Sequence, residues 1–332
     1  MEVRARAPGK LVLLGEYAVL DGARALVMAV RRYCRARLEP SIDGACRLET
    51  RFPDPSVSTF AVGAATGDPL IDAVTAELGG DTRWPAWSGC LDSAEFFTDG
   101  RKLGLGSSAA ALVAWAGAWS RLDRSGRAPP TLRDLVRAHR MFQGGAGSGL
   151  DVAAAYTGGI IDFRLDSDSA PLVGSVLPPN SVGFAGIFPG SSASTPNLVA
   201  RYDRWKAHEP KRWAELTRRM HVIAEQGYAA ARENDGPRFL AAIAEYGCSL
   251  GALGNAMGAD LVTAEHQQIE QLAKRFDVVY KISGAGGGDL GLACSLDADA
   301  LNVFAAAAEE QGFHAVELAI DNEGLVIEEL AE

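Results

Sequence analysis

The first part of the chain shows the side-chain alternation typical of β-structure. Residues 3–7 (VRARA) alternate apolar and polar positions, a Pro-Gly pair interrupts them, and an apolar run follows at 10–15 (KLVLLG). This pattern predicts a strand, a turn and a second strand. Residues 25–40 continue in the same β-rich style, whereas residues 52–58 (FPDPSVS) predict a loop.

Helical spacing alternates with these strands. Asp68 is an N-cap for the helical pattern that follows it, and an alanine-rich helix begins at Ser107, after an Asp-Gly hairpin signal at 99–100. Thr131 and Asp134 approximate a capping box at the start of another helix. Further helices are expected near 209–232, 237–255, 261–275 and 300–312, and further strands near 278–284, 290–296, 314–321 and 325–330.

Mixed strands and helices indicate an α/β or α+β protein. The 332 residues are enough for two domains. Residues 165–180 (LDSDSAPLVGSVLPPN) are the best candidate for a boundary, because the chain changes from mixed to mainly helical character after them. We therefore predict one domain over residues 1–170 and a second over residues 171–332.

Composition narrows the class of protein. Hydrophobic residues make up 48% and charged residues 22%, as in ordinary globular proteins, and the formal net charge is -10. Because no cluster of Lys and Arg is present, we expect no nucleic-acid partner. No apolar run approaches the ~20 residues needed to span a bilayer, so we expect no membrane partner. The five cysteines lack metal-ligand spacing, and the N-terminus turns polar too early for a signal peptide. These features predict a cytoplasmic protein.

The glycine-rich stretch at 104–111 (GLGSSAAA) is the first candidate site. Glycines allow the backbone to turn and to approach a ligand closely. The first N–H groups of the helix that follows lack partners inside the helix, and with the helix dipole they form an anion site. The same run is also compatible with a tight turn that caps a buried helix.

Nucleotide motifs of other folds do not explain this stretch. The sequence contains no GxxxxGK[ST], which excludes a P-loop. GLGSSA matches the dinucleotide fingerprint GxGxxA, but a second helix follows it instead of a strand that ends in an acidic residue. A similar match at 286–291 (GGGDLG) is followed by strand character, so neither match indicates NAD.

Three motifs in this order are similar to those of the GHMP kinase superfamily. They are APGKLVLLGEYAVL at 7–20, GLGSSAAA at 104–111 and SGAGGGDLG at 283–291, and they span almost the whole chain. The resemblance implies an α/β (α+β) two-domain fold. Its N-terminal half is an S5-like α/β domain with a left-handed crossover, and its C-terminal half is a ferredoxin-like α+β domain. ATP is expected between the two.

Several details most resemble the phosphomevalonate kinases. These are the Lys-Leu step before GLGSS, the run AHRMFQGGAGSGLDVAAAYTGG and the stretch at 191–199 (SSASTPNLV), which resembles a segment near the substrate. Mevalonate kinases usually carry a magnesium-binding glutamate where this chain has Arg140. The resemblance implies magnesium- and ATP-dependent phosphorylation of 5-phosphomevalonate to 5-diphosphomevalonate in isoprenoid-precursor synthesis. A small phosphorylated substrate is the expected partner.

The resemblance also implies roles for individual residues. Lys10 and Asp151 are the catalytic candidates, and Ser108 is the expected Mg²⁺ ligand. The ATP phosphates are expected on Gly104, Leu105, Gly106, Ser107, Ser108 and Ala109. The substrate is expected near Lys102, His139, Arg140, Ser148, Gly149, Ser194, Thr195, Gly284, Ala285, Gly286 and Gly287. Glu16, in the first motif, is either a structural acceptor or a site residue.

Other functions remain open at this point. The nearest alternative is a mevalonate kinase or another small-molecule GHMP kinase, and a more remote one is a non-catalytic nucleotide-binding sensor. The intact Lys10, Ser108 and Asp151 favour an enzyme. The sequence leaves open the exact acceptor, the second magnesium ligand, feedback regulation, the extent of domain closure and the oligomeric state, a homodimer included.

Overall fold

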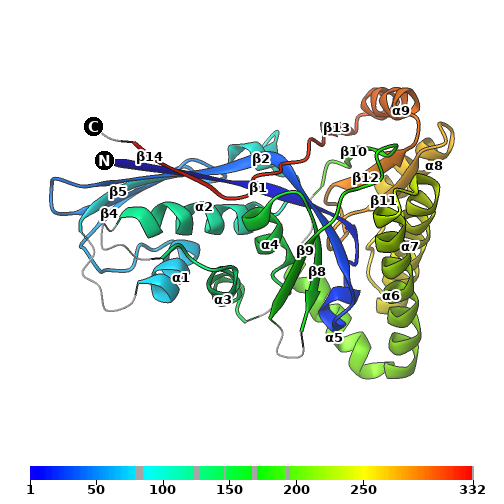
Figure 1. Ribbon diagram of the computed structural model, residues 1–332, viewed down its shortest axis with the longest axis horizontal. Helices are drawn as coiled ribbons and strands as arrows, with labels where there is room; N and C mark the ends of the chain where they lie inside the picture. The colour runs from blue at the N-terminus through cyan, green and yellow to red at the C-terminus, as the bar shows by residue number, and fades with distance from the viewer. Residues whose placement is uncertain (80–84, 123–127, 146, 167–169, 192–194, 331–332) are drawn as a thin grey trace.

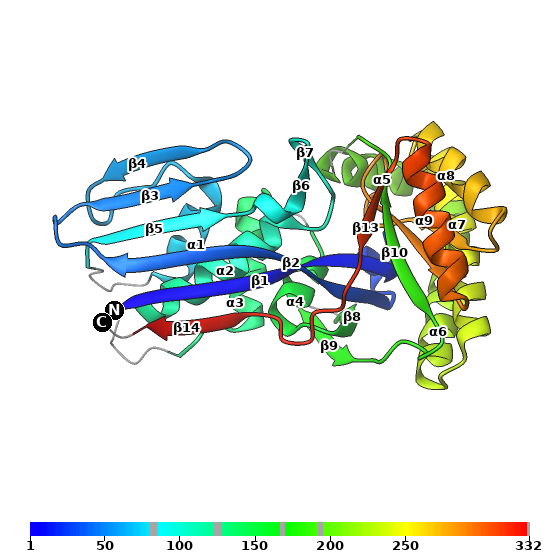
Figure 2. The same ribbon diagram turned by 90° about the horizontal axis from the view of Figure 1, so that it is seen from above.

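A computed structural model describes residues 1–79, 85–122, 128–145, 147–166, 170–191 and 195–330. A large sheet with helices packed on one face forms one end of the molecule, and a smaller sheet with its own helices forms the other (Figures 1 and 2). The two termini lie side by side at the end far from the smaller sheet. The fold is thus the mixed α/β arrangement that the sequence predicts.

Two long antiparallel strands, β1 (Glu2–Leu14) and β2 (Ala25–Pro40), are the centre of the first sheet. The turn predicted at the Pro-Gly pair is wrong: β1 continues through it, with a register shift between Pro8 and Gly9. The ladder resumes because β2 absorbs the shift, pairing Pro8 with Tyr33 and Gly9 with Val30. The strand therefore runs without a break through the Pro-Gly pair.

Shorter strands complete the first sheet on both sides of this pair. They are β3 (Cys46–Thr50), β4 (Ser56–Phe60), β5 (Trp87–Asp92), β8 (Ile160–Leu165), β9 (Pro171–Ser175) and β14 (Val326–Leu330). Strand β4 begins inside the predicted loop 52–58, because it pairs with β3 as an antiparallel neighbour. A separate hairpin, β6 (Phe97–Thr98) and β7 (Arg101–Lys102), confirms the Asp-Gly signal.

Four helices cover one face of this sheet (Figure 1). They are α1 (Pro69–Leu78), α2 (Ser107–Leu122), α3 (Leu132–Phe142) and α4 (Leu150–Thr157), and two short 3-10 helices are η1 (Ala18–Asp21) and η2 (Ala94–Phe96). The predicted cap at Asp68 and the Thr131–Asp134 capping box are confirmed. Helix α2 is buried nearly all round, because its alanines let the sheet and the other helices approach closely.

The second sheet has the strand order β11-β12-β10-β13. Its strands are β10 (Gly183–Phe188), β11 (Val279–Ile282), β12 (Gly291–Ser295) and β13 (His314–Glu317). Its helices are α5 (Thr195–His208), α6 (Pro210–Arg232), α7 (Gly236–Met257), α8 (Ala264–Lys274) and α9 (Ala298–Glu310). This β-α-β-β-α-β order is the ferredoxin-like one. Among the described helices, none is both long enough and apolar enough to cross a membrane.

The predicted boundary after residue 170 does not coincide with the sheets. Strand β9 pairs with β8, and β14 pairs with β1, so residues on the C-terminal side of that boundary complete the first sheet. Strand pairing rather than position along the chain decides which sheet a segment joins. Residues 319–330 therefore return to the N-terminal sheet, as Figure 2 shows.

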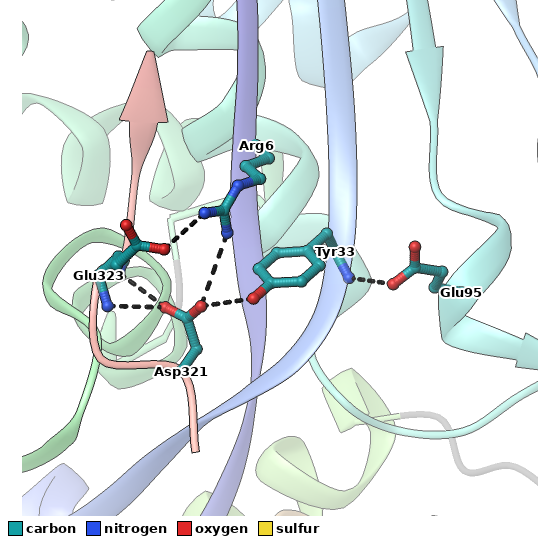
Figure 3. Close-up of polar contacts among 6 residues, drawn as sticks. Arg6, Tyr33, Glu95, Asp321 and Glu323 are labelled. Carbon is teal, nitrogen blue, oxygen red and sulfur yellow. Dashed lines mark hydrogen bonds and ion pairs between the residues drawn. The ribbon is translucent and has the colours of Figure 1, made fainter. Parts of the chain in front are cut away.

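Asp321 fastens this returning segment to the first sheet (Figure 3). Tyr33 donates its hydroxyl to Oδ2 of Asp321 at 2.6 Å, and an Arg6 nitrogen lies 3.7 Å from the same oxygen. The backbone N–H groups of Glu323 and Gly324 donate to the other oxygen at 3.1 and 2.7 Å. Because Asp321 is only 2% exposed, these partners satisfy a carboxylate that water does not reach.

Candidate active site

The loop between β7 and α2 has the geometry of an anion site. Gly104 and Gly106 have φ values of 81° and 78°, a region that favours glycine, and α2 begins at Ser107. The N–H of Ala110 donates to the carbonyl of Gly106, so Gly106 closes the first helical turn. The N–H groups of that turn point out of the helix end toward any bound anion.

Lys10 lies against this loop from β1. Its Nζ donates to the carbonyl of Gly104 at 3.2 Å, and its backbone N–H donates to the carbonyl of Leu105 at 2.8 Å. A Cβ placed on Gly106 would lie 3.1 Å from Cγ of Lys10 and 3.7 Å from Cβ of Asp151. The absence of a side chain at Gly106 therefore leaves the space in which Lys10 and Asp151 meet the helix end.

Asp151 reaches the same place from the first turn of α4. Gly149 precedes this helix with φ 83°, and a Cβ there would lie 2.8 Å from the side chain of Val136. The buried Ser148 accepts a bond from the N–H of Leu150 at 3.4 Å. Oδ1 of Asp151 accepts a bond from the N–H of Val152 at 3.0 Å, which fixes the carboxylate at the helix end.

Two residues near the end of α3, His139 and Arg140, contact the protein segments that form the site. His139 is 2% exposed, and its Nε2 lies 3.3 Å from Oγ of Ser108. Arg140 donates to the carbonyls of Gly147 and Ser148 at 3.1 and 3.4 Å. Both side chains thus hold parts of the protein, one the phosphate-loop helix and the other the loop that leads to Asp151.

The glycine run after β11 forms the opposite wall. A Cβ on Gly284 would lie 3.4 Å from Nζ of Lys10, and Tyr17 donates its hydroxyl to the carbonyl of Ala285 at 2.6 Å. The N–H of Gly287 donates to the carbonyl of Leu261 at 2.8 Å, and a Cβ on Gly286 would collide with that carbonyl. The run is therefore packed tightly between Lys10 and the loop before α8.

Asp289 joins the glycine run to the phosphate loop. A Cβ on Gly104 would lie 2.5 Å from Cβ of Asp289, and the N–H of Leu290 donates to the carbonyl of Leu103 at 3.1 Å. Lys102 is exposed on β7, but the surrounding protein partly desolvates its ammonium and lowers its pKa below the usual value. Asp289 opposes this shift, Lys10 adds to it and Asp151 opposes it. Lys102 thus interacts electrostatically with Lys10 and with both carboxylates.

Most of the residues singled out from the sequence come together here. Ser194 lies outside the described residues, and Thr195 begins α5. Two contributors were missed, Asp289 and Lys281. Asp289 directly follows the glycine run, and Lys281 is a lone charge in an otherwise apolar strand, so each carried a signal in the sequence. Glu16 is resolved as the buried partner of Lys281.

A cavity of about 540 Å³ lies elsewhere, between α7, α8 and β11. Leu261 and Ile282 line it, but none of the residues expected to bind ATP or substrate does. Its position behind the glycine run separates it from the lysines and carboxylates described above.

Comparisons with known proteins agree with this geometry. A family profile described as the GHMP kinases N terminal domain matches residues 100–159. A phosphomevalonate kinase of a Streptomyces species is 30% identical over 346 residues, which covers 89% of this chain and 90% of that protein. The chain belongs to the GHMP kinase family.

Other relatives of this GHMP kinase differ in their named substrate. A mevalonate kinase of Thermococcus sibiricus is 28% identical over 360 residues and matches the whole of both chains. The solved structure of Streptococcus pneumoniae phosphomevalonate kinase, in complex with phosphomevalonate and AMPPNP, superposes with a TM-score of 0.82. It is 19% identical and covers 96% of this chain and 99% of its own, so it supports the fold.

The residues of this GHMP kinase fit the phosphates of a nucleoside triphosphate. The helix end, the two glycines of the phosphate loop and Lys10 leave a cradle that a single added Cβ would fill. Among the described residues, no group of three or more His, Cys, Asp or Glu side chains could hold a metal ion. Magnesium usually binds through one or two protein groups together with phosphates and water, so the hydroxyl of Ser108 fits that pattern.

Proposed function

We propose that this chain transfers the γ-phosphoryl group of ATP to the phosphate of 5-phosphomevalonate, giving 5-diphosphomevalonate and ADP. The observation that carries this proposal is the convergence of Lys10 and Asp151 at the N-terminal end of α2, with Lys102 of β7 interacting electrostatically with both. Phosphoryl transfer depends mainly on positioning and on charge neutralisation. One lysine at the helix N-terminus and a second that interacts with it electrostatically suit a reaction that brings two phosphate groups together.

The phosphate loop is the proposed ATP site. The backbone of residues 104–109 and the hydroxyl of Ser107 would bind the phosphates, and Ser108 would be the magnesium ligand. Bound magnesium would neutralise negative charge on the phosphoryl group during transfer. His139 holds the Ser108 hydroxyl from behind, so we assign His139 a positioning role.

Lys10 and Asp151 are the proposed catalytic residues. Lys10 would neutralise the transferred group, because its Nζ already lies at the loop that would hold the phosphates. A phosphomonoester is mostly dianionic at neutral pH, since its second pKa is about 6. Asp151 is therefore less needed as a base than as an anchor that orients Lys10 and the acceptor.

Lys102 is the proposed cation for the acceptor's own phosphate. Lys102, one of the three cations considered from the sequence, interacts electrostatically with Asp289, Lys10 and Asp151. His139 and Arg140 instead contact the protein. We infer that Arg140 positions the loop before Asp151. We also infer that one wall of the acceptor pocket is formed by Gly284, Ala285, Gly286 and Gly287.

Mevalonate kinase is the second candidate function. The engagement of His139 and Arg140 by protein atoms leaves fewer cations for a phosphorylated acceptor, which a neutral alcohol would not need. The full-length match to the Thermococcus mevalonate kinase also favours it. The two candidates differ only in the acceptor, so one assay separates them.

The test measures ADP release by the purified protein with ATP and magnesium. Mevalonate, 5-phosphomevalonate, galactose and homoserine are offered separately. We expect turnover with 5-phosphomevalonate alone. Turnover with mevalonate alone would replace the proposal with the second candidate, and no turnover with either would refute both.

A further inference from the structure

Glu16 and Lys281 form an ion pair that the proposed chemistry does not use. Glu16 follows β1, and Lys281 belongs to β11 of the other sheet. Their side chains are 1% and 0% exposed. Nζ of Lys281 donates to Oε1 of Glu16, to the carbonyl of Ile282 at 2.8 Å and to the carbonyl of Val12 at 3.4 Å. The pair is thus enclosed between the two sheets.

Stability alone is a weak reason for such a pair. Removing two charges from water costs free energy that their attraction repays only in part, and apolar replacements are often as stable. Burial raises the pKa of Glu16, and the ammonium of Lys281 opposes this shift. Oε2 of Glu16 is buried and has no hydrogen-bond partner among the described residues, which adds to the cost.

The position of the pair relates it to the candidate active site. Lys281 comes two residues before Ser283, where the glycine run begins, and Val12 comes two residues after Lys10. Ser283 accepts a bond from the N–H of Val12 at 2.9 Å and donates its hydroxyl to the Val12 carbonyl at 3.0 Å. These bonds and the ion pair fix β11 against β1 at the point where Gly284 approaches Lys10.

A second element holds Glu16 in place. Tyr246 of α7 donates its hydroxyl to the backbone carbonyl of Glu16 at 2.8 Å. The neighbouring Tyr17 is held at φ 60°, which is uncommon for a residue with a side chain, and it donates to the glycine run at Ala285. These contacts hold the segment that contains Glu16, so Glu16 can fix the position of β11 relative to β1.

We propose that Glu16 and Lys281 are positioning residues that set the glycine run, residues 283–288, at a fixed distance from Lys10 and the phosphate loop. This proposal rests on the proposed function for its kinetic consequence, but not for its structural one. Neither side chain reaches the solvent, so neither touches a bound substrate. Loss of the pair would loosen the glycine run and misplace it during phosphoryl transfer.

The test compares Lys281→Met with Lys274→Met. Lys274 carries the same charge in the same domain, but its pair with Glu270 is on the surface of α8, with the lysine side chain 58% exposed. We expect Lys281→Met to lower kcat at least about tenfold, with a change of less than about threefold in the KM for ATP. Lys274→Met should leave both unchanged. Glu16→Gln, the conservative variant, should lie between wild type and Lys281→Met.

Hydrogen exchange supplies a readout that does not depend on the substrate. The amides of Gly287 and Leu290 are bonded to Leu261 and Leu103, so their exchange reports the fixation of the glycine run. We expect faster exchange at these amides in Lys281→Met and unchanged exchange in α9. If Lys281→Met does not fold, the charge-neutral double variant Glu16→Gln/Lys281→Met is measured in the same way.

The outcomes separate this inference from the proposed function. Unchanged kcat and unchanged exchange in a folded variant with lowered stability would show that the pair only stabilises the fold, and would overturn the inference. If wild type turns over none of the acceptors, the proposed function fails while the exchange experiment still decides the role of the pair. Faster exchange at the glycine run with unchanged exchange in α9 would support it.

Discussion

At the scale of the residue, a substitution at Asp151 tests whether its carboxylate acts as a general base or as an anchor that orients Lys10 and the acceptor. A general base contributes about 10²–10⁴-fold to proton removal from a hydroxyl, but a phosphate acceptor is already ionised. Asp151→Asn keeps the oxygen that accepts from Val152, so the end of α4 should remain intact. With 5-phosphomevalonate we expect a loss in kcat of less than about tenfold, well below the contribution of a base. Steady-state kinetics measure it, and complete loss in a folded variant would contradict the anchor role.

Asp289 tunes the charge of Lys102. Its carboxylate opposes the desolvation that lowers the pKa of Lys102, so Asp289→Asn should lower that pKa further. The KM for 5-phosphomevalonate should then begin to rise at a lower pH than in wild type, because Lys102 loses its proton earlier. The measurement is the pH dependence of this KM on the alkaline side. Asp99→Asn, at an exposed carboxylate of the hairpin, is the control.

A shift toward higher pH in Asp289→Asn, or none, would contradict this assignment. Lys102→Met should remove the alkaline rise altogether, because no titrating ammonium would remain at that position.

These residues also show what a sequence can reveal. Lys10, Ser108 and Asp151 stand in local motifs, whereas the approach of Asp289 to Gly104 depends on two segments that are distant in sequence.

At the scale of the element, substitutions at Gly106 and Gly44 separate the effect of backbone strain from the effect of steric crowding. Alanine at this position would have to adopt φ 78° and would also meet Lys10 at 3.1 Å. Gly44 has φ 72° with nothing within 4 Å of its added Cβ, so Gly44→Ala carries the strain without the crowding. Both variants should lose about 1–2 kcal/mol of stability, measured by denaturant unfolding.

Only Gly106→Ala should affect the reaction. Displacement of Lys10 by a fraction of an ångström to one ångström is expected to reduce kcat/KM for ATP by about 10–10²-fold. Steady-state kinetics at saturating acceptor would measure the loss, and Gly44→Ala should match wild type. Equal effects in the two variants would mean that strain alone, rather than the cradle at α2, accounts for the change.

Elements with strong local signals were predictable. The Asp68 cap, the capping box at Thr131 and the Asp-Gly hairpin rest on neighbouring residues and appear as expected. The turn at the Pro-Gly pair and the extent of β4 failed because strand pairing overrides local preference. The sequence pattern predicts no helix at α5, because the stretch 191–199, in which α5 begins, is interpreted by its resemblance to a segment near the substrate.

At the scale of the whole molecule, the order of segments along the chain does not reveal the order of the strands in the sheets. A boundary chosen from composition cannot show that β9 and β14 return to the first sheet, because their partners are β8 and β1. The motifs were sufficient for the family and for the two-sheet architecture. The contacts that join the two sheets, such as the Glu16–Lys281 pair, depend on residues more than 260 positions apart and leave only faint local signals.

The return of the C-terminal segment gives the last prediction. Asp321→Ala would leave the Tyr33 hydroxyl and the N–H groups of Glu323 and Gly324 without their buried acceptor (Figure 3). We expect a loss of about 2–4 kcal/mol in the free energy of unfolding, as for other broken buried networks. Urea unfolding measures it. Glu323→Ala is the control, because that side chain is 63% exposed and its ion pair with Arg6 contributes little.

The loss should also be local before it is global. Because Asp321 fixes the chain just before β14, its removal should speed amide exchange in Val326–Leu330 more than in β10 and β12 of the other sheet. Uniform acceleration in both sheets would instead mean that the whole molecule unfolds in one step. Unchanged stability in Asp321→Ala would contradict the fastening role, and the pairing of β14 with β1 would then have to hold the C-terminal segment by itself.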